Sequence, residues 1–246
     1  MSMEMLNRYF NIVSERFQNI VETQEETLET IKNLVKETIK NDRLIYLFGS
    51  GHSHATAEEF FCRAGGFACV SAILEEPLMV HTGGMTATVM ERLEGYAKIA
   101  FSKYNCKPED ILFIFSNSGI NAAPVEMAQE AKKIGMTVVC FTSLAHSKSQ
   151  EPRHSSGLRL CDVADICLDT GVPPGDATIE LPNGVKTAPI STMMCVPIVH
   201  GMFAQAAHEL CQEGIEPPVF FSANVKGGDE KSAKLVEKYK SRVRCM

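Results

Sequence analysis

Short, continuously apolar runs alternate with helix-like segments along most of this sequence. The apolar runs that predict strands are residues 44–48, 69–74, 111–115, 137–141 and 166–168. The segments that predict helices are residues 53–63, 86–104, 122–134, 192–211 and 230–240. Strands that are apolar on both faces are typical of a parallel sheet covered by helices on either side. We therefore predict an α/β fold in which ligands bind at the carboxyl ends of the strands.

Residues 3–40 follow a different pattern from the rest of the chain. They contain no glycine or proline, and apolar residues recur at steps of three and four. This predicts a long helix or a pair of helices with one apolar stripe. A single helix of about 35 residues would measure about 50 Å, more than a domain of this size needs. We expect part of the stripe to pack on a second subunit; the alternative is that it lies only on its own domain.

The domain division that follows is a helical segment, residues 1–40, and a second region, residues 41–246. Within the second region two stretches depart from the alternation of strands and helices. Residues 143–156 are polar, and residues 172–190 are rich in proline and glycine. Loops of this length usually build a site or are disordered.

The charge and the cysteine pattern exclude several classes of protein. The 24 Lys and Arg against 30 Asp and Glu give a net charge of −6, which argues against a protein that binds nucleic acid through phosphate contacts. The nine cysteines are an odd number without Cys-x-x-Cys spacing, which favours reduced thiols in a cytoplasmic protein. The N-terminus has no signal-peptide pattern, and the most apolar later stretch is interrupted by Pro197, His200 and Gly201. We expect no membrane span.

A glycine-rich turn follows the first predicted strand. Residues 49–54, Gly-Ser-Gly-His-Ser-His, lead into a predicted helix, whose free N–H groups favour an anion. The turn is not a complete dinucleotide fingerprint, because His54 stands where the third glycine would fall, and it has no Walker A lysine. Glu75 and Glu76 end the next predicted strand, so a nicotinamide dinucleotide remains an alternative ligand.

A hydroxyl-rich turn follows the third predicted strand. Residues 116–121, Ser-Asn-Ser-Gly-Ile-Asn, also lead into a predicted helix. Hydroxyls, an amide and a helix start can all donate to phosphate oxygens without carrying charge. Thr142 and Ser143 follow the fourth predicted strand and extend this set. One such turn is often only a helix cap, but together they predict a rim of neutral donors around an anionic group.

The order and spacing of these turns resemble the sugar isomerase (SIS) domain. The resemblance covers roughly residues 40–215 and rests on Gly-Ser-Gly-x-Ser, Ser-Asn-Ser-Gly, Thr-Ser and a final Ala-Pro-Ile-Ser-Thr helix start. The sequence is most similar to stand-alone bacterial SIS proteins, which include sedoheptulose phosphate isomerase and N-acetylmuramic acid 6-phosphate etherase. The resemblance implies a three-layer α-β-α sandwich with a flavodoxin-like five-stranded parallel sheet. It also implies a phosphosugar ligand and sites shared between the subunits of a homodimer or homotetramer.

The resemblance further implies which residues bind the phosphosugar. Ser116 and Ser118 would be the main hydroxyl donors, and Asn121 falls at the family's threonine or asparagine position. The full predicted set is Gly51, Ser53, Ser116, Asn117, Ser118, Gly119, Asn121, Thr142 and Ser143.

The catalytic residues do not transfer directly from the relatives. The heptose isomerase and the etherase resemble each other in a glutamate about ten residues beyond the first motif's serine, and Arg63 stands at that position here. Glu59 lies one turn earlier on the same helix face and is the first candidate for the base. The other candidates are His52, His200, His208 and the loop acid Asp176. A helix-capping role for His52 and a core role for His200 are the alternatives.

We expect a cytoplasmic aldose–ketose isomerase that acts on a sugar phosphate or amino-sugar phosphate by proton abstraction. One alternative is a non-catalytic phosphosugar sensor that regulates a partner protein, which the replacement of the glutamate by Arg63 favours. Another is a lyase-type etherase, which shares the first proton abstraction. No metal or other cofactor is expected, because His81, His146 and His154 are scattered along the chain without a supporting ligand cluster.

Overall fold

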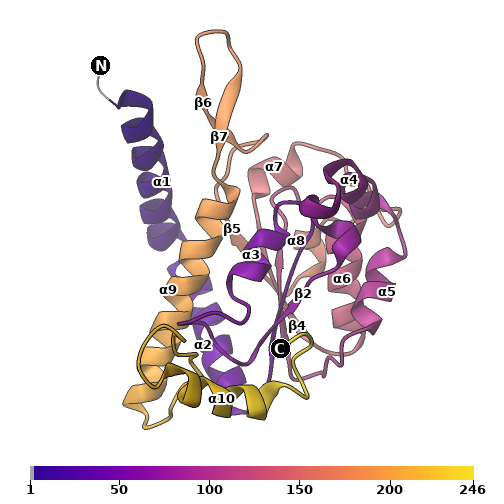
Figure 1. Ribbon diagram of the computed structural model, residues 1–246. Coiled ribbons are helices and arrows are strands. Elements are labelled where there is room, and N and C mark those ends of the chain that lie inside the picture. The colour runs from indigo at the N-terminus through magenta and orange to yellow at the C-terminus, as the bar shows by residue number, and fades with distance from the viewer. Residues whose placement is uncertain (1–2) are drawn as a thin grey trace.

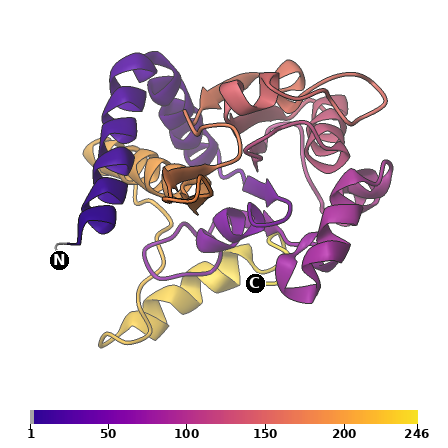
Figure 2. The ribbon, with the colours of Figure 1, turned by 90° about the horizontal axis from the view of Figure 1, so that it is seen from above.

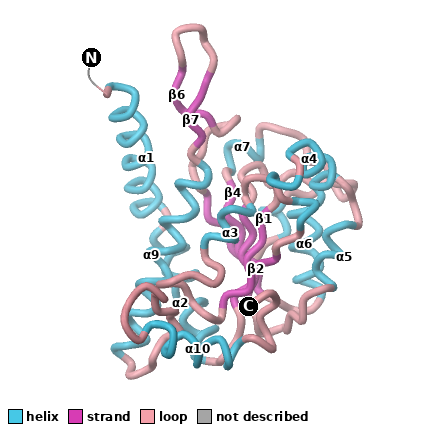
Figure 3. Tube along the Cα trace, in the orientation of Figure 1, coloured by secondary structure: helices cyan, strands magenta, loops and turns pink. Residues whose placement is uncertain are grey.

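A five-stranded parallel sheet forms the centre of the computed structural model, which describes residues 3–246 (Figure 3). Its strands are β1 (Ile45–Gly49), β2 (Val70–Ile73), β3 (Ile111–Phe115), β4 (Thr137–Thr142) and β5 (Ile166–Asp169). Neighbouring strands pair in parallel, in the order β2-β1-β3-β4-β5. The predicted flavodoxin-like sheet is therefore confirmed.

Helices cover both faces of the sheet, which confirms the predicted three-layer sandwich (Figure 1, Figure 2). One face carries α2 (Glu25–Lys40), α3 (His54–Glu59) and α9 (Ser191–Gln212). The other face carries α4 (Gly84–Arg92), α5 (Tyr96–Ser102), α6 (Ala122–Lys133) and α8 (Leu160–Val163). Because both faces are covered, every residue of β1 and β3 is buried. Among the described residues, no helix is both long enough and apolar enough to cross a membrane.

The N-terminal segment is a pair of helices, α1 (Glu4–Thr23) and α2, separated at Gln24. The side chain of Gln24 donates to the carbonyl oxygen of Asp169 at 2.7 Å and accepts the N–H of Asp169 at 2.9 Å. This contact fixes the break between the two helices beside the end of β5. Residues 1 and 2 of the predicted segment lie outside the described residues.

The apolar stripe of α1 is only partly covered. Val13 and Ile20 pack against Val172 and neighbouring apolar side chains in a small second core, whereas Phe10 on the same helix remains exposed. In Figure 1 the N-terminal half of α1 extends away from the sheet, on the same side as the β6–β7 hairpin, β6 (Ala177–Glu180) and β7 (Lys186–Pro189). Part of the stripe is thus free within one chain.

The structure corrects three local predictions. The helix predicted at residues 86–104 is divided into α4 and α5, because the chain turns at Gly95 with φ 86°. The helix predicted at residues 53–63 is limited to α3. The stretch at residues 172–190 is not a plain loop, because it contains the antiparallel β6–β7 hairpin.

Shorter helices complete the described chain. They are the 3₁₀ turns η1 (Glu76–Leu78) and η2 (Val80–Thr82), and α7 (Leu144–Lys148), which lies within the predicted polar loop. The helix α10 (Gly228–Tyr239) follows near the C-terminus, below the sheet in Figure 1.

Candidate functional site

The strand order places the two predicted motifs side by side. Strand β1 lies between β2 and β3, so the connections from β1 and from β3 leave on opposite faces, and a crevice opens at their carboxyl ends. The turn at residues 49–53 follows β1, and the turn at residues 116–121 follows β3. Donors that are more than sixty residues apart in the sequence are neighbours for this reason.

Glycine is required in the first of these turns. A Cβ atom at Gly49 would lie 2.2 Å from the carbonyl oxygen of Ser53, and Gly51 has a φ of 59°. The buried His54 ring stabilises the turn from within, since its Nδ1 lies 2.6 Å from the carbonyl oxygen of Gly51. The motif therefore makes a tight turn that brings the backbone of residues 51–53 close to the end of the sheet.

A small polar pocket lies between these turns and the start of α9. Its hydroxyl and amide side chains come from Ser53, Thr56, Ser116, Asn117, Thr170, Ser191 and Thr192. The pocket has a volume of about 10 Å³, roughly the space that one water needs. Its lining contains no charged side chain. Such a group of neutral donors suits an anion that carries its own charge.

Two polar atoms in this pocket have no hydrogen-bond partner among the described residues. They are Oδ1 of Asn117 and Oγ1 of Thr170, and both are buried. The hydroxyl oxygen of Ser116 accepts the N–H of Gly119 at 3.1 Å, which leaves its own proton for another acceptor. Because buried polar groups are normally paired, the unpaired atoms mark the pocket as a place for a polar ligand.

The predicted phosphosugar-binding residues divide into two groups. Ser53, Ser116 and Asn117 line the pocket, whereas the rest of the predicted set lies beside it. Thr142 donates to the carbonyl oxygen of Asn117 at 3.3 Å, and Ser143 donates to that of Val172 at 2.5 Å. These two hydroxyls fix the surrounding loops rather than facing the pocket.

Asn121 belongs to a separate charged network. Its amide nitrogen donates to Glu91 at 2.7 Å, and its amide oxygen accepts from Arg153 at 2.9 Å. The remaining members of the set, Gly51, Ser118 and Gly119, supply backbone in the two turns and do not line the pocket.

Four of the polar lining residues were not predicted individually as ligands. Thr56 lies on α3. Thr170 directly follows β5, and Ser191 and Thr192 begin α9. The sequence did contain a signal for Thr170, because it is a hydroxyl residue at the carboxyl end of a strand, like Thr142. Ser191 and Thr192 belong to the Ala-Pro-Ile-Ser-Thr helix start that carries the SIS resemblance.

Asp176 is used as the cap of α9. Its carboxylate accepts the N–H groups of Ile190 at 3.0 Å and Ser191 at 2.8 Å, and the Ser191 hydroxyl at 2.6 Å. A carboxylate at a helix N-terminus is stabilised by the unpaired N–H groups and the helix dipole. The loop acid considered from the sequence therefore has three hydrogen bonds that hold it at the entrance of the helix.

Two of the predicted proton-transfer candidates meet between α3 and α9. Nε2 of His200 lies 3.3 Å from Oε1 of Glu59, and Glu59 is also paired with Arg63. The ring of Phe60 packs against the imidazole with ring centres 4.5 Å apart. Burial, and then the positive charge of Arg63, lower the pKa of His200, which favours the neutral imidazole.

His52 and His208 lie outside this group. Both side chains are exposed. His208 follows His200 by two turns on α9, a distance of about 12 Å along the helix axis. The structure thus brings Glu59, His200 and Arg63 together and leaves the other two histidines apart.

Comparisons with known proteins place the chain in a family. The model of the SIS domain family matches residues 8–143, more than half of the chain. The UPF0309 protein GK1441 of Geobacillus kaustophilus is 39% identical over 240 residues, which cover 97% of this chain and 96% of that protein.

Two solved structures have a similar fold. Phosphoheptose isomerase GmhA from Neisseria gonorrhoeae superposes with a TM-score of 0.56 at 18% identity, covering 82% of this chain and 97% of its own. The Vibrio vulnificus NanR protein complexed with ManNAc-6P superposes with a TM-score of 0.54 at 13% identity, covering 99% of this chain and 71% of its own. Together with the family model, the strand order and the motifs, these comparisons give one conclusion: the chain belongs to the SIS domain family.

Proposed function

We propose that this protein binds a sugar phosphate at the polar pocket and interconverts its aldose and ketose forms. The observation that carries the proposal is the convergence of neutral donors on the pocket, among them the buried and unpaired hydroxyl of Thr170. A phosphate brings its own negative charge and needs donors rather than a counter-charge. The name of GmhA as a phosphoheptose isomerase and the ManNAc-6P bound to NanR support this ligand class.

The pocket has to widen when a phosphate binds. A volume of about 10 Å³ accommodates a water and not a phosphate group. The start of α9 forms one wall of the pocket, and Asp176 covers its N–H groups from the β6–β7 region. A phosphate that displaces this carboxylate would gain the same N–H donors.

We assign the proton transfer to His200, with Glu59 beside it. A neutral imidazole can remove the proton from the carbon next to the open-chain carbonyl of an aldose phosphate. The resulting enediolate takes this proton back at the former carbonyl carbon, and the proton of the neighbouring hydroxyl moves to the former carbonyl oxygen, which gives the ketose. The carboxylate of Glu59 is engaged by its ion pair with Arg63, which suits a role in orienting the imidazole better than a role as the proton acceptor.

A non-catalytic sugar-phosphate sensor is the second candidate function. The same ion pair between Glu59 and Arg63 favours it, because it engages the carboxylate that would otherwise be the first choice for the base. An etherase differs from an isomerase because, after it removes the same proton, it expels an ether substituent. It differs from a sensor because it carries out a reaction. The three functions therefore differ in what happens after binding.

Thermal unfolding in the presence of ligands tests the binding step. Hexose, pentose, heptose and amino-sugar phosphates are compared with inorganic phosphate and with nicotinamide dinucleotides. A ligand at 100 times its Kd adds about 2.7 kcal/mol to the free energy of unfolding. We expect at least one sugar phosphate to raise the melting temperature. A response to dinucleotides alone would contradict the proposed ligand class.

Solvent deuterium exchange then separates the functions. An isomerase incorporates deuterium from D₂O at the carbon next to the carbonyl and produces the isomeric sugar. A sensor binds the same ligand without exchange, and an etherase releases the substituent. Tight binding without exchange would reject the isomerase and leave the sensor.

A further inference from the structure

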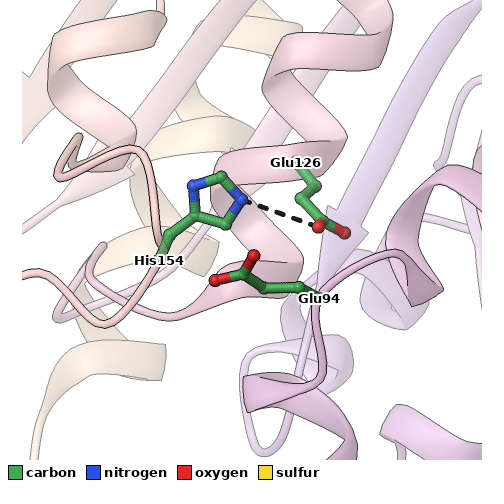
Figure 4. A group of neighbouring side chains, drawn as sticks. All are labelled: Glu94, Glu126 and His154. Atoms are coloured by element: carbon green, nitrogen blue, oxygen red, sulfur yellow. Dashed lines mark ion pairs between the residues drawn. The ribbon is translucent and has the colours of Figure 1, made fainter.

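A second group of polar side chains lies on the opposite face of the sheet from α9 (Figure 4). Glu94 comes from the turn between α4 and α5, Glu126 from α6, and His154 from the loop after α7. One ligand atom of each residue lies within 4.8 Å of the other two. The three side chains approach one another from three separate segments, which the sequence alone does not bring together.

Glu126 is buried, and half of its carboxylate is unpaired. The residue is 8% exposed. Its Oε1 accepts the N–H of Gly95 at 2.6 Å and lies 3.6 Å from Nε2 of His154. Its Oε2 is buried without a hydrogen-bond partner among the described residues. A buried carboxylate oxygen without a partner is costly, so the position calls for a positive charge.

No lysine or arginine of the described chain forms an ion pair with Glu126 or Glu94. Glu94 instead accepts the N–H and the hydroxyl of Ser155, each at 2.7 Å. Two carboxylates therefore approach one imidazole with no permanent cation between them. A bound divalent cation between the three side chains would neutralise both acids.

The imidazole of His154 is positioned as a metal ligand. Its Nδ1 accepts the N–H of Ser156 at 3.3 Å and lies 2.7 Å from the hydroxyl oxygen of the same residue. A metal on Nε2 would shift the imidazole proton to Nδ1, where that hydroxyl oxygen would accept it. Zn²⁺ bonds of about 2.0–2.2 Å place tetrahedral ligands about 3.3–3.6 Å apart, and the distance from Nε2 to Glu126 Oε1 is 3.6 Å.

We propose that Glu94, Glu126 and His154 bind a divalent transition metal of the Zn²⁺ and Mn²⁺ class. An imidazole ligand disfavours Mg²⁺ and Ca²⁺, which prefer oxygen ligands alone. Glu126 and His154 already have the required spacing. Glu94 lies on an exposed turn and would move toward them to complete the site. Three protein ligands leave a further coordination position for a water or another ligand.

Metal binding would fix the loop that carries His154 to α6. Arg153 precedes His154 and donates to Asn121, the residue at the start of α6. The metal would thus hold Arg153 in place beside the turn at residues 116–121. This proposal stands independently of the isomerase proposal, because it concerns metal binding and not turnover.

Isothermal titration of the EDTA-treated full chain with MnCl₂ and with ZnCl₂ tests the proposal. Mn²⁺ is included because the cysteines, which bind Zn²⁺, are poor ligands for it. We expect the wild type to bind one equivalent at this site. His154→Ala and Glu94→Gln should each lower the affinity at least tenfold. His208→Ala, which removes an exposed histidine elsewhere, should bind as the wild type does.

Two further readouts keep the result decisive. Glu94 is exposed, so Glu94→Gln tests the site even if His154→Ala disturbs the loop, and circular dichroism checks that each variant is folded. The melting temperature of the wild type should rise with metal, and that of Glu94→Gln should not. A wild type that binds neither metal, or variants with the same isotherms as the wild type, would overturn the proposal.

Discussion

Two pairs of glutamate and histidine stand on opposite faces of the same sheet, and they differ in the third group beside them. Glu59 and His200 are 3.3 Å apart, are more than a third exposed, and have Arg63 next to the carboxylate. Glu126 and His154 are 3.6 Å apart, are about one tenth exposed, and have Glu94 next to them. Burial, and then the positive charge of Arg63, lower the pKa of the first imidazole, whereas a second carboxylate makes the other pair a place for a cation. The sign of one neighbouring charge thus separates a candidate proton carrier from a candidate metal ligand.

Replacing His200 and His154 one at a time should give the largest difference between the two pairs, measured as solvent deuterium exchange. His200→Asn should lower solvent deuterium exchange into the bound sugar phosphate by about 10²–10⁴-fold, because it removes the general base. His154→Asn should reduce the exchange rate far less, since it alters only a loop beside the pocket. Exchange is followed by mass spectrometry or NMR of the sugar. A larger loss in His154→Asn than in His200→Asn would reverse the roles of the two pairs.

Removing hydroxyls from the phosphate pocket tests that pocket separately from the two pairs of glutamate and histidine. Ser116→Ala and Thr170→Val should each weaken the binding of the sugar phosphate by about 1.5–3 kcal/mol, or roughly 10–150-fold, because each removes a donor to a charged acceptor. Calorimetric titration measures the change. Ser102→Ala, at an exposed position on α5, is the control. Unchanged affinity in both pocket variants would show that the phosphate binds elsewhere, and the metal site would then be the next candidate.

Assembly is expected through an exposed apolar groove beside α9. The groove between α1 and α9 is lined by Phe17, Val21, Pro197 and Gly201. A second copy of the chain seated on this groove would cover the exposed side chain of Val21. Val21→Glu should therefore shift a dimer or tetramer toward monomer in sedimentation velocity.

The matched control for that variant is Val89→Glu on α4. Val89 is 64% exposed and Val21 is 59% exposed, so a general effect of a surface glutamate would appear in both. A wild type that sediments as a monomer at micromolar concentration would reject assembly through this groove. The predicted homodimer or homotetramer would then be wrong as well.

The smallest expected effect concerns the charge of Arg63. Arg63→Met should raise the pKa of His200, since Arg63 lowers that pKa in the wild type. The pKa of His200 is lower in the folded state than in the unfolded state. The free energy of unfolding therefore decreases as the pH falls from the pKa of the unfolded state through that of the folded state. The variant should lose less stability over that interval. NMR titration of the imidazole measures the pKa, and Arg92→Met on α4 should leave it unchanged.

The fold was largely predictable because its signals are local. Runs such as residues 111–115 are apolar on both faces, and only a covered parallel sheet accommodates them. The break at Gly95 was missed, since the apolar pattern on both sides of it suggested one helix. The start of α9 was recognised through its motif, but the cap that Asp176 provides depends on a hairpin that brings Asp176 next to Ile190 and Ser191, which are fourteen and fifteen residues later in the chain.

The site was less predictable because it depends on distances between segments. The turn at residues 116–121 was identified as a whole, yet Ser116 and Asn117 face the pocket while Asn121 joins Glu91 and Arg153. The same limit applies to the expectation from the sequence that no metal binds. From the sequence His154 had no ligand cluster, and the structure places two carboxylates beside it that are 28 and 60 positions earlier in the chain. The functional roles of Glu59, His52, His200 and His208 stay predictions.

Gln24 also blocks the pairing of a further strand at the β5 edge of the sheet. Strand β5 is at the end of the strand order, and such a strand offers unpaired backbone groups to a strand of another molecule. The amide of Gln24 occupies both the N–H and the carbonyl oxygen of Asp169, and Arg16 donates to the carbonyl oxygen of Gly171. Two side chains of the N-terminal helices thus stand where a sixth strand would begin. The helical pair thereby protects the sheet against edge-to-edge aggregation.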